Sequence, residues 1–137
     1  MQFAGMNYLA IVAAAAAAYV FSAVYYTLLS RHWLNAAGLT RESAGRKRPW
    51  LPFVVALVAD LVLAWILAGV VGHLGLGQVT VRNAMISGAF VWLGFVLTTI
   101  AVNNAFAGRK PMLTLIDAAH WLGVLLVAGL VIGLFGI

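Results

Sequence analysis

Apolar residues occur along this chain in four long runs, separated by short segments that hold most of the charged side chains. The runs cover residues 3–29, 51–74, 81–106 and 112–136, and each exceeds the roughly 20 residues that a helix needs to cross a bilayer. None alternates apolar and polar positions in the manner of a membrane β-strand. The pattern predicts an all-α polytopic membrane protein, in which residues 1–137 form one domain of four transmembrane helices in a bundle with short loops.

The basic residues set the expected orientation of these helices. Seven of the eight lie within residues 31–50 and 107–111, and only Arg82 lies on the other side. Lys and Arg are enriched in cytoplasmic loops. We therefore expect a multi-pass protein of the bacterial cytoplasmic membrane, with cytoplasmic basic loops and both termini in the periplasm.

The first basic segment also holds candidates for contact with the membrane surface. Residues 32–39 are expected to form a short helix in the interface, with Trp33 at headgroup depth. The cluster of Arg46, Lys47 and Arg48 has two interpretations. It binds anionic lipid headgroups, or it acts only as a topology signal.

Composition narrows the class of protein. The chain is 65% hydrophobic and only 8% charged, which excludes a soluble globular domain, a disordered chain and a soluble catalytic module. The net charge of +5 lies in the loops, so nucleic acid is not an expected partner. With no cysteine, disulfides, thiolate metal sites and cysteine nucleophiles are excluded. No familiar enzyme motif occurs, and we expect neither enzyme activity nor a cofactor.

Polar side chains inside the predicted spans gather in two layers nearer the basic loops. Depth follows from the rise of about 1.5 Å per residue along a helix. The layer nearer the loops holds Tyr25, Tyr26, Asn103, Asn104 and Asp117. The deeper layer holds Ser22, Asp60, Thr98, Thr99 and His120. Ionisable groups at such depths are costly, and they mark functional candidates or buried hydrogen-bond networks.

Asp117 and His120 are three residues apart and share one helix face. A carboxylate and an imidazole at this spacing form a structural pair, a proton relay or part of a metal site. A metal needs three or four ligands, and Asp60 is the only further acid or histidine near this depth, so no metal site is expected. We expect Asp117 to meet Asn103, because both lie equally far from the turn between their helices.

Asp60 lies near mid-bilayer with no basic residue at its depth. Burial in hydrocarbon disfavours the charged form of a lone carboxylate. Asp60 is therefore either a neutral structural acid or a proton carrier. In the structural case, its expected hydrogen-bond partners are Ser22, Thr98 and Thr99.

Pairs of small residues four apart allow helices to approach closely, either within the chain or between copies of it. Three such pairs occur: Ala84 and Gly88, Ala119 and Gly123, and Gly129 and Gly133.

Several short motifs together resemble domain-of-unknown-function family number 1761, a group of small membrane proteins of bacteria and fungi. The motifs are Met6-Asn7-Tyr8-Leu9-Ala10, Tyr25-Tyr26-Thr27-Leu28-Leu29, Ala37-Gly38-Leu39-Thr40, Trp92-Leu93-Gly94-Phe95-Val96, Asn103-Asn104-Ala105-Phe106 and Leu115-Ile116-Asp117-Ala118-Ala119-His120-Trp121-Leu122. The resemblance implies a four-helix membrane domain and no particular activity. It directs attention to Tyr26, Trp33, Gly38, Asn103, Asp117 and His120.

Two functions fit the sequence. The first is a non-enzymatic scaffold or accessory protein, in which the polar layers serve packing. The alternative is a small transporter or channel that handles a proton, a cation or a small solute through Asp60, Asp117 and His120. Four short helices enclose little space, so we expect a homo-oligomer in contact with the lipid bilayer.

Overall fold

Each predicted run forms a helix. The computed structural model describes residues 2–45 and 47–137. Its elements are α1 (Tyr8–Ala37), α2 (Leu51–Gly72), α3 (Val81–Val91), the π-helical η1 (Trp92–Leu97), α4 (Thr98–Phe106) and α5 (Pro111–Phe135). The segments α3, η1 and α4 follow one another without a break, as the span Val81–Phe106. Within the described residues, four helices are thus long and apolar enough to cross a membrane, and this is a multi-pass membrane protein.

Local residues fix where the helices begin and end. The side chain of Asn7 accepts a hydrogen bond from the Ala10 N–H at 3.1 Å, and that of Thr80 accepts one from the Asn83 N–H at 3.2 Å. These bonds satisfy N–H groups that a first helical turn leaves unpaired. Gly38 ends α1 with a φ of 69°, a left-handed conformation that a residue without a Cβ adopts freely.

The first helix differs from its predicted bounds. It begins at Tyr8 rather than at residue 3, and it runs without interruption to Ala37. The prediction of a separate interfacial helix at residues 32–39 is therefore wrong, because these residues mostly form the last turns of α1. Arg31 ends the apolar run but not the helix, since no Pro or Gly follows before Gly38.

The basic loop after α1 is only partly described. Arg46 of the predicted headgroup cluster lies outside the described residues. Lys47 and Arg48 are exposed.

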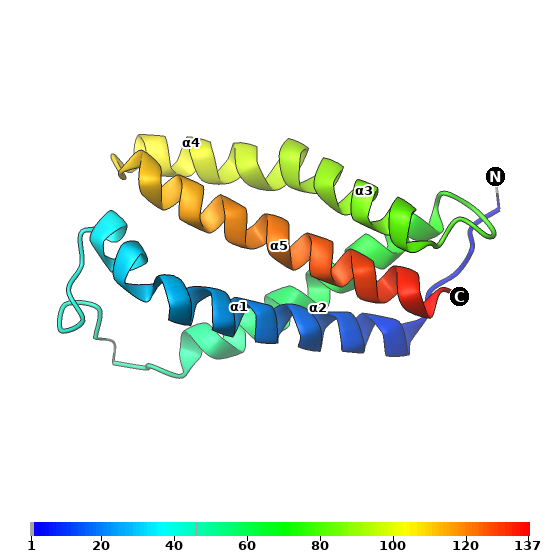
Figure 1. Ribbon diagram of the computed structural model, residues 1–137, viewed down its shortest axis with the longest axis horizontal. Helices are drawn as coiled ribbons and strands as arrows, with labels where there is room; N and C mark the ends of the chain where they lie inside the picture. Colours follow the sequence, from blue (N-terminus) through cyan, green and yellow to red (C-terminus); the bar gives the residue numbers. More distant parts are fainter. Residues whose placement is uncertain (1, 46) are drawn as a thin grey trace.

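The helices run up and down, so that alternate connections lie at the same end. Figure 1 shows α5 between α1 on one side and the α3–η1–α4 helix on the other, with α2 behind. Residues 73–80 lie near both chain termini, at what we call the terminal end. Residues 38–50 and 107–110 lie at the opposite, basic end.

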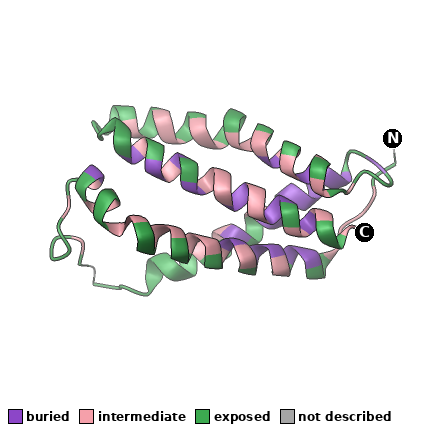
Figure 2. Cartoon of the chain, viewed as in Figure 1, coloured by how far each residue is buried: buried purple, intermediate pink, exposed green. Residues whose placement is uncertain are grey.

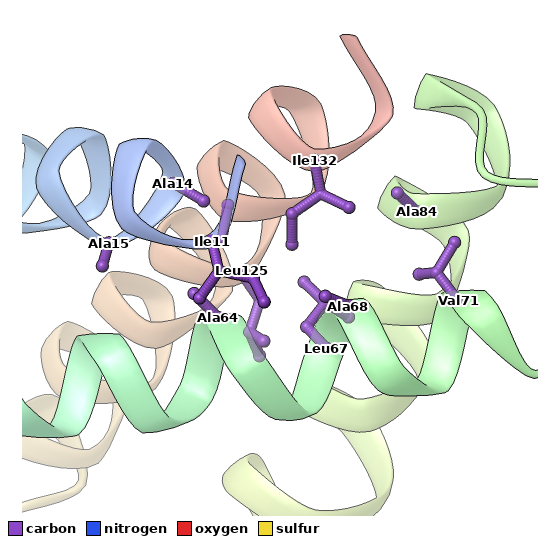
Figure 3. Packing of buried hydrophobic residues seen from close by; sticks show 11 residues of the cluster. Ile11, Ala14, Ala15, Ala64, Leu67, Ala68, Val71, Ala84, Leu125 and Ile132 are labelled. Carbon is purple, nitrogen blue, oxygen red and sulfur yellow. The ribbon is translucent and has the colours of Figure 1, made fainter. Parts of the chain in front are cut away.

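The apolar core lies in the half of the bundle nearer the terminal end, where all four membrane-spanning helices pack together (Figure 3). Alanine is the commonest residue of this core. Its members are Ile11, Ala14, Ala15, Ala64, Leu67, Ala68, Val71, Ala84, Leu125, Ala128 and Ile132. Glycines bring α3 and α5 into backbone contact. A Cβ built at Gly129 would lie 2.9 Å from the carbonyl oxygen of Ala84, and one at Gly88 would lie 3.0 Å from that of Leu125. The small residues Gly88 and Gly129 thus serve packing within the chain.

The half nearer the basic end is packed differently (Figure 2). Residues 51–55 of α2 are all exposed, and five consecutive residues cover every side of a helix. Neither η1 nor α4 contains a buried residue, and α2 makes no close contact with either of them in the described part of the chain. A small apolar cluster of Ala36, Leu113 and Ile116 joins α1 to α5 instead.

The close contact of α3 with α5 is testable with one methyl group. We expect Gly129→Ala to lower the free energy of unfolding by about 1–3 kcal/mol, because the new Cβ meets the backbone of α3 and forces the helices apart. Thermal unfolding in detergent measures the effect. Gly94→Ala is the matched control, since among the described residues no atom outside the local backbone of its own helix lies within 4 Å of a Cβ at Gly94. Equal stability of the two variants would contradict the packing.

Candidate functional site

One carboxylate joins α1 to α5 in the half nearer the basic end. The Oδ1 atom of Asp117 accepts hydrogen bonds from the Tyr26 hydroxyl at 2.7 Å and from the Trp33 indole N–H at 3.1 Å. The hydroxyl of Tyr25 donates to the backbone carbonyl of Ile116 at 2.7 Å. These bonds join donors of α1 to acceptors of α5, so the arrangement holds two antiparallel helices in a fixed register.

His120 lies one turn further along α5 and faces the same helix. Its Nε2 atom lies 2.7 Å from the Ser22 hydroxyl, which donates to the Ala18 carbonyl at 3.0 Å. A hydroxyl carries one proton, so Ser22 accepts its second bond from the Nε2–H of His120. The neutral ring then carries its lone pair on Nδ1. That atom is buried and has no hydrogen-bond partner among the described residues.

Aromatic rings surround the His120 imidazole. The ring centroids of Tyr26 and Trp121 lie 4.6 and 4.8 Å from that of the imidazole, and those of Tyr25 and Phe21 lie 5.5 and 6.3 Å away. The Phe21 ring is nearly parallel to the imidazole, at an interplanar angle of 13°. Only 4% of His120 is exposed. These rings fix the orientation of the imidazole and keep it from lipid and water.

The polar residues that meet between these two helices form what we call the α1–α5 cluster: Ser22, Tyr25, Tyr26, Trp33, Asp117 and His120. Two of its bonds join residues of the same predicted layer, Tyr26 with Asp117 and Ser22 with His120.

Among the described residues, Asp60 forms no hydrogen bond with a residue of the α1–α5 cluster. It is 2% exposed, and its Oδ2 atom has no partner in the described part of the chain. The three hydroxyls predicted to bond it bond to backbone carbonyls of their own helices instead: Ser22 to Ala18, Thr98 to Gly94 and Thr99 to Phe95. Both threonines are exposed.

The predicted contact between Asn103 and Asp117 does not form as a hydrogen bond among the described residues. Asn103 is exposed, whereas Asp117 faces α1. Asn104 takes the predicted bridging role between the two neighbouring helices, because its side-chain amide donates to the Thr114 hydroxyl at 3.0 Å.

The bond of Trp33 to Asp117 is the contact that the sequence did not predict. The pattern places Trp33 at headgroup depth, and the family resemblance singles it out without a partner. Ser22, Tyr26 and Trp33 lie four and seven residues apart, a spacing that puts all three on one helix face. The signal was therefore present in the sequence. It becomes readable only when α1 is extended through residue 37.

In the part of the chain that the structure describes, no metal-ligand group and no hollow coincides with the α1–α5 cluster. Among the described residues, no three His, Asp or Glu side chains lie close enough to hold a metal ion. An open hollow of about 430 Å³ lies at the basic end, and a far smaller one of about 10 Å³ lies at the terminal end. Neither is lined by Asp60, Asp117 or His120.

Comparison with known proteins gives one match. The family of proteins of unknown function DUF1761 matches residues 9–133. No curated protein and no solved structure matches the chain. The matched region contains the whole α1–α5 cluster and Asp60.

The bonds to Asp117 predict a graded effect of substitution. We expect Asp117→Ala to lower the free energy of unfolding by about 1–3 kcal/mol, because it leaves two donors of α1 without an acceptor. Asp117→Asn keeps an oxygen at this position and should cost less. Thermal unfolding in detergent compares the variants. Asn103→Ala, on an exposed side chain, is the control, and a loss there as large as in Asp117→Ala would contradict the assignment.

Proposed function

We propose a function for this chain, which belongs to the DUF1761 family of proteins of unknown function. In this proposal it is a non-enzymatic scaffold or accessory protein of the membrane. The observation that supports this proposal is the pairing within the α1–α5 cluster. The hydroxyls and indole of α1 bond to acceptors of α5, and His120 of α5 bonds back to Ser22 of α1. Polar groups paired in this way hold membrane helices together.

The surfaces that such a scaffold offers to its surroundings are apolar. The first turns of α2 and the η1–α4 segment expose large side chains, among them Phe53, Val54, Phe95 and Phe106. Within the membrane these faces contact lipid or another protein, and we propose a second copy of this chain as one occupant. A membrane scaffold of this kind requires no cofactor and no nucleic acid.

A second candidate is transport of a proton or a cation, and one observation favours it. The Oδ2 atom of Asp60 and the Nδ1 atom of His120 are both buried without a partner among the described residues. Unpaired buried polar groups are destabilising, so a chain that retains them gains something else from them. In this second proposal, Asp60 and His120 exchange a proton with a solute that passes through a homo-oligomer.

The orientation in the membrane is also a proposal. The concentration of Lys and Arg at the basic end supports a cytoplasmic position for that end and a periplasmic position for both termini, in a bacterial cytoplasmic membrane.

Single-cysteine labelling tests this orientation cleanly, because the chain has no cysteine of its own. We expect Ala44→Cys, in the loop at the basic end, to react with a membrane-impermeant maleimide only after the cells are opened. Gln78→Cys, in the connection at the terminal end, should react in intact cells. The reverse pattern would show that the orientation is inverted.

Asp60 separates the two candidate functions. No described donor bonds to its carboxylate, so Asp60→Asn should leave the thermal stability in detergent within about 0.5 kcal/mol of the parent. Under the scaffold proposal, proton and potassium flux through liposomes containing the parent protein equals that of empty liposomes. A flux that the parent supports and the stable Asp60→Asn variant lacks would overturn the scaffold proposal in favour of transport.

A further inference from the structure

The hollow at the basic end lies between the last turns of α1 and the first turns of α5. It is open rather than enclosed, with a volume of about 430 Å³. It is lined by Leu29, His32, Asn35, Ala36, Lys110, Met112 and Ile116. Ala36 and Ile116 are buried, while His32, Asn35 and Lys110 are exposed. One wall is therefore apolar, and the rim is polar and basic.

The rim attracts negative charge. The Lys110 ammonium group donates to the Asn35 carbonyl at 3.2 Å, which places the charge of α5 across the end of α1. None of the described residues that line the hollow is acidic. Asp117, which follows the lining residue Ile116, has one carboxylate oxygen engaged by Tyr26 and Trp33 of α1.

The length of α1 places this rim at the membrane surface. A helix of 30 residues is about 45 Å long, whereas the hydrocarbon core of a bilayer is about 30 Å thick. Because the C-terminal turns of α1 hold Arg31, His32 and Asn35 and its first turns are apolar, we place the excess length at the C-terminal turns, at the depth of the phosphate groups. The apolar residues Leu29 and Ile116 lie deeper than the rim, where the first carbons of an acyl chain lie.

We propose that this hollow binds one anionic phospholipid of the surrounding bilayer. The lipid phosphate lies against Lys110 and His32, and the first part of an acyl chain lies against Leu29, Met112 and Ile116. The match of a basic rim with an apolar wall, at headgroup depth, supports a lipid over a soluble anion. This site is distinct from the loop residues Lys47 and Arg48, and the proposal holds for either candidate function.

The test uses the full chain in nanodiscs of phosphatidylcholine with a minor fraction of phosphatidylglycerol. Native mass spectrometry after release measures which lipid stays bound. We expect the parent to retain one phosphatidylglycerol in preference to phosphatidylcholine. Lys110→Gln should reduce this preference about fivefold, the effect of one basic side chain at a membrane surface. Lys47→Gln, which removes the same charge outside the hollow, should leave it unchanged.

A second variant tests the apolar wall without changing charge. Leu29→Trp fills the hollow and should also abolish retention, which keeps the test decisive if Lys110→Gln does not fold. Thermal protection by inorganic phosphate equal to that by phosphatidylglycerol would overturn the lipid assignment. Equal losses in Lys110→Gln and Lys47→Gln would show diffuse attraction to charge and overturn the site. Flux through liposomes plays no part in these readouts, so failure here is separable from failure of the proposed function.

Discussion

The hydrogen bonds to Asp117 matter to the fold because the apolar core shared by all four spans lies in only one half of the bundle. Toward the basic end, the first turns of α2 and all of α4 contribute no buried residue. There α1 and α5 pack through Ala36, Leu113 and Ile116, with Tyr25, Tyr26 and Trp33 against them. A carboxylate at this point is costly in a membrane unless donors meet it. Tyr26 and Trp33 supply those donors from α1. The need of this half-buried carboxyl group for donors thus becomes a reason for the two helices to stay in register.

In the half nearer the terminal end, the helices associate through complementary shape. Lipid is as apolar as the side chains it contacts, so membrane helices associate through close packing rather than through the hydrophobic effect. The glycines at positions 88 and 129 let the backbones of α3 and α5 touch, and alanines of α1 and α2 pack among the larger side chains of the core. Close packing therefore joins the helices in the half nearer the terminal end, and polar bonds join them in the half nearer the basic end. Helix α5 takes part in both.

The sequence predicted well the length of the helices and the depth of each residue along them. It did not predict the rotation of each helix about its own axis. The apolar runs gave four helices, because only an unbroken run of this length crosses a bilayer. Counting residues from the loops put Tyr26 with Asp117 and Ser22 with His120, and these pairs form bonds. The same count also grouped Asn103, Thr98 and Thr99 with them, yet these three face outward. Residues at one depth point in every direction around a bundle, and helices that are apolar on all sides carry no stripe that fixes their rotation.

The uneven packing makes the two leaflets of the bilayer unequal solvents for this protein. In one leaflet, acyl chains meet the outside of a closed bundle. In the other, they contact the exposed first turns of α2 and the segments η1 and α4, which contain no buried residue. In that leaflet lipid therefore meets a larger share of the helix surface. A change in membrane thickness or fluidity acts on this protein mainly from one side.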